Sequence, residues 1–154
     1  MDKIMDIINS YIFDIDNKKQ INMYYEIGCY IKENNIDIKK LALYIRENLG
    51  LTIAFTDRNL NNMIKFSNYN KSLLNKLEQI TWKNILVIMK HDESLIDLCI
   101  KYKPTKQELE DYINIHKKLK NNDIIEMDDT LEELINLRKW YYDSTQSSKK
   151  RRNC

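Results

Sequence analysis

The sequence predicts an all-α protein, and three observations carry that prediction. The 154 residues include only two glycines and one proline, which is too few for a β sandwich or barrel with its frequent turns. Apolar residues recur at helical spacing along most of the chain. Two capping boxes, at residues 105–108 and 130–133, mark helix starts. Because a chain of this length holds one domain and rarely two, we expect one compact multi-helix domain.

Three helices are predicted before residue 50. They cover about residues 3–15, 18–34 and 37–49, and Gly50 is the expected C-terminal cap of the third. Gly28 lies inside the second helix, where glycine costs about 1 kcal/mol relative to alanine. We therefore expect Gly28 to let another backbone approach closely. The predicted apolar side of the second helix is Ile21, Tyr24, Tyr25, Gly28 and Ile31.

The next predicted helix, over residues 57–68, is the centre of the expected fold. Thr56 is a good N-cap, and Asp57 places an anion in the first turn. Residues 51–55 form either a short extended segment or a buried loop. The helices before and after this loop have the outline of a helix-turn-helix, with a joint of about six residues where three or four are usual. The predicted buried stripe of the 57–68 helix is Leu60, Met63 and Ile64, with Ser67 as a further candidate.

The other face of the 57–68 helix carries amides and cations, whereas exposed helix faces usually mix carboxylates and lysines. Amide and cationic groups can hydrogen-bond phosphate oxygens and base edges. Asn59 either joins these contacts or has a structural role. The alternative interpretation is an ordinary solvated face in a chain that is rich in Asn throughout. The candidate DNA-binding residues are Arg58, Asn59, Asn61, Asn62 and Lys65.

Further helices are expected in the rest of the chain. Residues 71–80 form one or two helical turns, and Thr81 caps a helix over 82–90. The predicted inner face of that helix is Trp82, Ile85, Leu86 and Met89. A short helix follows at about 93–101. The capping box at 105–108 opens the next one, which ends at about Leu119.

We expect three regions in the chain. Residues 1–119 form the helical domain, residues 120–143 an acidic linker with a C-terminal helix, and residues 144–154 a disordered basic tail.

The net charge of +2 hides an uneven distribution. Residues 1–148 carry a net charge of −2, and residues 57–83 carry a local charge of +3. Residues 123–133 hold six acids and no base. Strong nucleic-acid binders are usually basic overall, so DNA binding would have to come from a local patch.

The sequence gives no sign of catalysis, of a cofactor or of a metal site. Cys29, Cys99, His91 and His116 lack the close spacing of zinc ligands, and two glycines cannot build a phosphate-binding loop of the dinucleotide type. The three cysteines are scattered, which favours reduced thiols in a cytoplasmic or nuclear protein. The chain has no apolar run of eighteen residues and no visible signal peptide, so we expect no membrane association.

Three blocks of the sequence resemble the signatures of one family, in the same order and spacing. Residues 24–31 resemble an aromatic-Trp-x-Ile-Gly-x-x-Ile signature, with Tyr25 in place of the Trp. Residues 55–66 resemble a Phe-Ser-x-Arg-Asn-Leu signature followed by Met and Phe, which is the most specific block. Residues 80–86 resemble a Leu-Thr/Ser-Trp signature followed by Leu-Leu. Residues 106–113 resemble its closing segment without the Trp and Arg.

The family is that of the YhcG-type PD-(D/E)XK nucleases, and the match is to their N-terminal domain over about residues 5–114. The resemblance implies a helical, winged-helix-like DNA-binding module centred on Arg58 and Asn59. In full-length relatives a nuclease domain follows, but no Glu-x-Lys occurs in this chain, and its nearest variant, Asp37-Ile38-Lys39, lies at a predicted helix start. We therefore expect no nuclease activity.

The sequence predicts a non-catalytic protein that binds duplex DNA through the 57–68 helix. The alternative is a protein-interaction or dimerisation module that binds no nucleic acid, through the consecutive aromatics Trp140, Tyr141 and Tyr142. The basic run at 149–152 is a nuclear localisation signal, a phosphate-contacting tail or a solubilising charge run. Its residues are Lys149, Lys150, Arg151 and Arg152.

Overall fold

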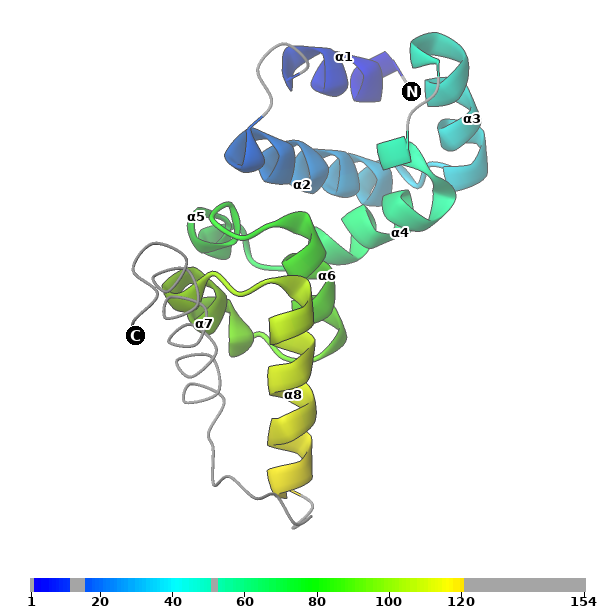
Figure 1. Ribbon diagram of the computed structural model, residues 1–154. Helices are drawn as coiled ribbons and strands as arrows, with labels where there is room; N and C mark the ends of the chain where they lie inside the picture. Colours follow the sequence, from blue (N-terminus) through cyan, green and yellow to red (C-terminus); the bar gives the residue numbers. More distant parts are fainter. Residues whose placement is uncertain (1, 12–15, 51–52, 121–154) are drawn as a thin grey trace, which may run out of the picture. The chain divides into compact units, whose positions relative to one another are not determined.

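The computed structural model describes residues 2–11, 16–50 and 53–120, without the side chains of residues 53, 115, 116 and 118–120 (Figure 1). The described residues form α-helices and short 3₁₀ helices, with no strand among them, so the predicted all-α class is confirmed. The elements are α1 (Asp2–Tyr11), α2 (Asn17–Asn34), α3 (Ile38–Leu49), η1 (Ile53–Phe55), α4 (Asp57–Phe66), η2 (Lys71–Leu73), α5 (Leu74–Leu77), α6 (Trp82–Lys90), α7 (Leu95–Tyr102) and α8 (Lys106–Lys120).

The chain divides into two compact units, Met1–Glu93 and Ser94–Cys154. The first contains α1 to α6, and the described part of the second contains α7 and α8. The predicted 1–119 domain spans both units. The predicted linker, C-terminal helix and basic tail over residues 120–154 lie outside the described residues, apart from residue 120 itself.

The helix ends follow the capping residues that the sequence supplies. The Asp37 side chain accepts from the Lys40 N–H at the start of α3, and Thr81 does the same for Asn84 at the start of α6. At the C-terminal end of α2, the cap residue Asn35 adopts the left-handed conformation with φ of 53°. The capping box at 105–108 forms in both directions, with each bond at 3.2 Å.

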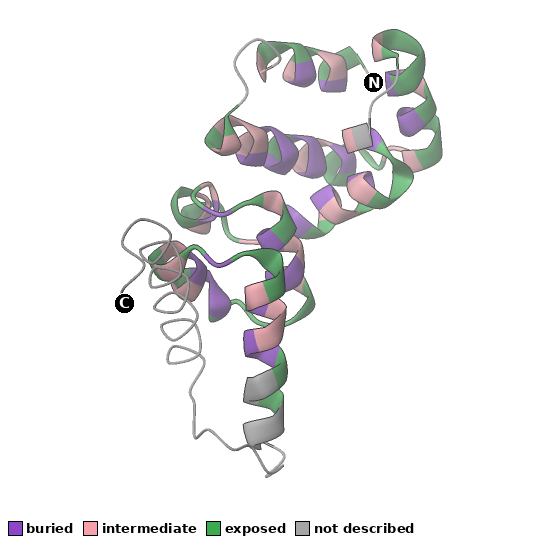
Figure 2. Cartoon of the chain, viewed as in Figure 1, coloured by how far each residue is buried: buried purple, intermediate pink, exposed green. Residues whose placement is uncertain are grey.

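Helix α2 is the central element of the first unit, because α1 and α4 both pack against it. Figure 2 shows buried residues along much of its length. The sequence predicted one apolar side, whereas Met23 and Ile27 are buried as well, at 3% and 0% exposure. Two packing partners cover a wider arc of a helix than one partner can.

Helices α2 and α4 approach each other closely at Gly28. A Cβ atom at this position would lie 2.6 Å from the Met63 carbonyl carbon, closer still to the carbonyl oxygen, and 3.1 Å from the Ser67 Cβ. The predicted close approach at Gly28 is therefore confirmed, and its neighbour is the backbone of α4.

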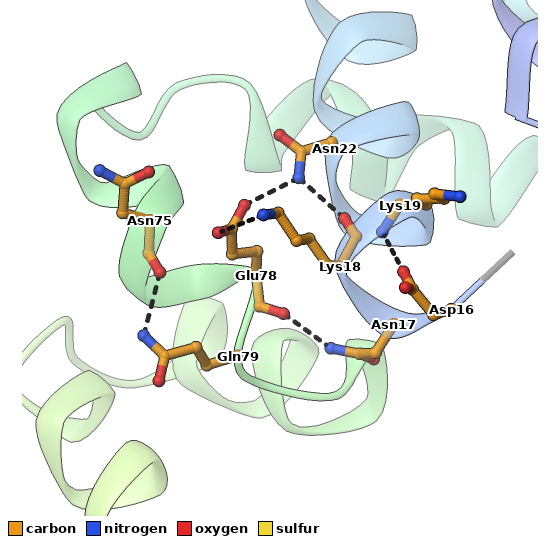
Figure 3. A network of polar contacts seen from close by, with 8 residues as sticks. All are labelled: Asp16, Asn17, Lys18, Lys19, Asn22, Asn75, Glu78 and Gln79. Atoms are coloured by element: carbon orange, nitrogen blue, oxygen red, sulfur yellow. Dashed lines mark hydrogen bonds and ion pairs between the residues drawn. The ribbon is translucent and has the colours of Figure 1, made fainter.

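A second set of contacts ties the end of α5 to the start of α2 (Figure 3). The Asn17 amide donates to the carbonyl oxygens of Glu78 and Ile80, at 3.0 and 2.9 Å. The Glu78 carboxylate accepts from Asn22 at 2.9 Å and lies 3.8 Å from the Lys18 ammonium. The bonds from Asn17 satisfy two carbonyl oxygens of the segment that connects α5 to α6.

Aromatic rings from three helices form a cluster beside Gly28. The Trp82 ring of α6 meets Tyr24 edge-on at 4.8 Å between centroids and Phe66 at 5.3 Å, and Phe66 meets Tyr25 at 5.6 Å. The predicted inner face of α6 was partly wrong. Ile85 is buried as predicted, but Trp82, Leu86 and Met89 are half-buried, and Val87 and Ile88 are buried instead. The Trp82 indole stays half-buried in this cluster because its polar N–H donates to the Asn59 side chain.

Replacing Gly28 with alanine should lower the free energy of unfolding by about 1–3 kcal/mol, because the new methyl group overpacks against the Met63 carbonyl. The gain in helix propensity, about 1 kcal/mol, acts in the opposite direction. Urea unfolding followed by circular dichroism measures the change. Glu33→Ala, on the exposed surface of the same helix, is the control and should stay within about 0.5 kcal/mol of the parent. A Gly28→Ala variant as stable as this control would contradict the close approach.

Tyr11 should make stability depend on pH above 10. Its hydroxyl donates to the Glu26 carboxylate at 3.0 Å, and burial together with that bond and charge raises the pKa of Tyr11 to about 12. The unfolded value is about 10, so the contribution of Tyr11 to stability is fully present below pH 10 and is lost as pH rises through 12. The stability difference between the parent and Tyr11→Phe, measured by urea unfolding, should therefore shrink between pH 9 and pH 12. A constant difference over that range would rule out this coupling.

Candidate functional site

Helix α4 begins as its sequence predicts and buries one stripe completely. The Thr56 hydroxyl accepts from the Asn59 N–H at 3.2 Å, which caps the first turn. Leu60, Met63 and Phe66 have no exposed surface. The predicted stripe was therefore right for Leu60 and Met63, whereas Ile64 is only half-buried and Phe66 takes its place. Since Leu60, Met63 and Phe66 repeat at helical spacing, their burial fixes which side of α4 faces solvent.

Four of the five candidate residues lie together on that solvent side. Arg58, Asn61 and Lys65 are exposed, and Asn62 is half-exposed. Residues three and four apart are neighbours on a helix surface, so Arg58, Asn61 and Lys65 form one continuous row. We call these four residues the α4 polar face.

The fifth candidate, Asn59, has its amide engaged inside the fold. Its nitrogen donates to the Ala54 carbonyl oxygen at 2.6 Å, and its oxygen accepts from the Trp82 indole N–H at 2.9 Å. Both bonds are part-buried and link α4 to η1 and to α6. Of the two roles that the sequence left open for Asn59, these bonds favour the structural one.

On the α4 polar face, the Asn61 side chain bonds within its own helix. The Asn61 amide nitrogen donates to the carbonyl oxygen of Asp57, one turn earlier, at 3.1 Å in an exposed position. Side chains of this kind exchange protein partners for other acceptors at little cost, because water already competes for them. Asn61 therefore differs from Asn59 in environment although both lie on the same short helix.

An open pocket of about 440 Å³ lies past the C-terminal end of α4. It is lined by Lys65, Asn68, Tyr69, Met89 and Glu93. Burial raises the pKa of Tyr69, and the charges of Glu93 and Asp92 raise it further. The phenol thus stays neutral at physiological pH, and the pocket presents one cation and one anion with neutral hydrogen-bonding groups between them.

Sequence reasoning missed Lys32, a cation of α2 that reaches the end of α4. Its ammonium donates to the Asn68 side-chain oxygen at 3.1 Å. Lys32 follows Gly28 by one helical turn, so both lie on the side of α2 that faces α4. The spacing from the predicted close-approach glycine was the available signal.

The described residues offer little that resembles metal or nucleophilic chemistry. Among them, no group of three or more His, Cys, Asp and Glu residues is arranged to hold a metal ion. Burial raises the pKa of the Cys99 thiol to about 12, so it stays protonated and unreactive at neutral pH. Within the same part of the chain, no helix has both the length and the apolar character needed to cross a bilayer.

Comparisons with protein-family models, with curated proteins and with solved structures each found no match for this chain. The likeness to the YhcG-type N-terminal domain accordingly stays a prediction that rests on its sequence blocks. The aromatic residues Trp140, Tyr141 and Tyr142 and the basic run at 149–152 lie outside the described residues.

Two asparagines on α4 should respond differently to truncation. Asn59→Ala removes the partner of the part-buried Trp82 N–H and of the Ala54 carbonyl, and it should cost about 1–3 kcal/mol of unfolding free energy. Asn61→Ala removes one exposed bond within the helix and should stay within about 0.5 kcal/mol of the parent. Urea unfolding compares the two variants directly. Equal effects would contradict the structural assignment of Asn59.

Proposed function

We propose that this chain binds duplex DNA without catalysing a reaction on it, through the α4 polar face. The observation that carries the proposal is the composition of that face. Arg58 and Lys65 supply cations, and Asn61 and Asn62 supply amides, within one surface stripe of a short helix. Arginine and asparagine are the side chains that pair most readily with guanine and adenine edges.

The dimensions of α4 suit a helix that lies in the major groove. Its ten residues correspond to a length of about 15 Å, and the groove is about 12 Å wide and 8.5 Å deep. In the proposed complex the α4 polar face meets base edges, while lysines of residues 71–83 contact the phosphate backbone. Those lysines are Lys71, Lys76 and Lys83, and all three are exposed.

The way α4 is held supports a recognition role. Gly28 sets the distance between α2 and α4, and Asn59 fixes the first turn of α4 to η1 and α6. A site that discriminates between bases needs side chains positioned on a rigid element. The resemblance to the YhcG-type DNA-binding module centres on the same turn and supports the same function.

A protein-interaction module is the second candidate, and the charge distribution favours it. Residues 1–148 carry a net charge of −2, whereas most nucleic-acid binders are basic overall. Under this alternative, the α4 polar face is a solvated surface and the partner is another protein. Such a chain would bind duplex DNA weakly at all salt concentrations.

The central test is a charge reversal on the α4 polar face. Arg58→Glu with Lys65→Glu should weaken binding to a labelled DNA duplex by at least about tenfold, because each lost base or phosphate contact costs about 1–3 kcal/mol. Both side chains are exposed, and Arg58 lies in the first turn of α4, where a carboxylate favours the helix. Fluorescence anisotropy at several salt concentrations measures the affinity, and circular dichroism confirms folding.

The matched control reverses two cations on α3. Lys39→Glu with Lys40→Glu makes the same change in net charge at exposed positions in the first turn of that helix, and it should leave affinity within about threefold of the parent. If both double variants lose affinity equally, binding depends on overall charge and α4 is not the site. If neither differs from the parent, the DNA-binding proposal fails.

A further inference from the structure

Cations and amides gather beyond the end of α4, where the α4 polar face stops. Lys32 of α2 donates to the Asn68 side-chain oxygen at 3.1 Å, and Asn68 shares the lining of the open pocket with Lys65. Asn68 therefore lies between a cation of α2 and a cation of α4. We propose that Lys32 and Asn68 together bind one backbone phosphate of the DNA and so extend the contact surface from α4 onto α2. This inference rests on the proposed function.

The chemistry of this pair favours an anion. The bond from Lys32 occupies one of the two lone pairs of the Asn68 side-chain oxygen. Most of the hydrogen-bonding capacity that the pair still offers lies in the N–H groups of the ammonium and of the amide, which are donors. Because the partner of Lys32 in this bond is neutral, the bond leaves the lysine charge uncompensated. Donors from two elements that meet at one point are the groups that hold phosphate oxygens.

A third lysine lies in the same neighbourhood. Burial raises the pKa of the Cys29 thiol, and the charges of Lys32 and Lys71 act on it in the opposite direction, while Glu33 raises it. Lys32 and Lys71 must therefore both lie near Cys29, although 39 positions of sequence separate them. The carboxylates near this region are Glu33 beside Cys29, and Glu93 and Asp92 beside Tyr69.

The turn that carries Asn68 is fixed in place by bonds of its own. The Tyr25 hydroxyl donates to the Tyr69 carbonyl oxygen at 2.8 Å, and the Ser67 hydroxyl donates to the Ile64 carbonyl oxygen at 2.6 Å. The Asn70 side chain accepts from the Ser72 N–H at 3.0 Å. Binding at this turn therefore requires little ordering of the backbone, which lowers the entropic cost of a contact.

The test measures how DNA affinity depends on salt, because each phosphate contact that a cation makes adds about 0.9 to the slope of log affinity against log salt. The probe is a labelled duplex, titrated with the full chain. Lys32→Gln should reduce the slope by about 0.9, and it should weaken binding to duplexes of different sequence by the same factor. Lys32→Arg keeps the charge and should keep the slope. Lys40→Gln removes an exposed cation elsewhere and should also leave the slope unchanged.

Asn68→Asp separates a phosphate site from a purely structural contact. The aspartate keeps a partner for Lys32 and makes the pair ionic, so a structural contact would be preserved or strengthened. The same change replaces the amide donor by a carboxylate and compensates the lysine charge, so a phosphate site would be lost. We expect Asn68→Asp to lower the slope as Lys32→Gln does while the free energy of unfolding does not fall.

The outcomes distinguish this inference from the proposed function. An unchanged slope in Lys32→Gln, while charge reversal at Arg58 and Lys65 abolishes binding, overturns the phosphate site and leaves the α4 interface standing. Equal losses in Lys32→Gln and Lys40→Gln also overturn it, because the effect is then one of net charge. If charge reversal on α4 has no effect either, the proposed function fails, and this inference fails with it.

Discussion

The first structural unit depends on the contact between α2 and α4 at Gly28. The Met63 carbonyl lies so close to the Gly28 α-carbon that no side chain fits between them. Two helices that touch through backbone atoms have little freedom to slide or rotate. The aromatic rings of Tyr24, Tyr25 and Phe66 pack beside this contact and extend it to α6. The position of α4, and with it the direction of its polar face, depends on the absence of a Cβ atom at Gly28.

Asn59 adds a second constraint, which acts on the first turn of α4. Its side chain bonds to Ala54, the middle residue of the 3₁₀ helix η1, and to Trp82 on α6. An amide that satisfies a donor and an acceptor on two other elements holds its own helix at a set angle. Asn59 is one of the two residues on which the sequence resemblance centres DNA recognition, and its bonds in this fold favour a structural role. Its neighbours Arg58, Asn61 and Asn62 are left on the surface that this scaffold presents.

Local features of the fold could be predicted from the sequence, because each depends on a few adjacent residues. The caps at Thr56 and Thr81 and the glycine at 28 have mechanisms that a short stretch reveals. The role of Asn59 stayed open since its partner Trp82 lies 23 residues away. Lys32 was missed for a similar reason. Its bond to Asn68 joins α2 to the turn after α4, so its spacing from Gly28 could indicate its side of α2 but not its partner. The helix-turn-helix geometry of α3 and α4 stays a prediction.

The net charge limits how strongly this chain would be attracted to DNA at long range. Residues 1–148 carry a net charge of −2, so they gain little from long-range attraction, which salt screens beyond about 8–10 Å in any case. Binding would then have to come from short-range contacts at the α4 polar face, where two neutral amides lie beside the two cations. Amides lose less on desolvation than charged groups do, and they read base edges that a lysine alone cannot tell apart. A face that mixes amides with two cations favours selectivity between sites over tight binding to any DNA.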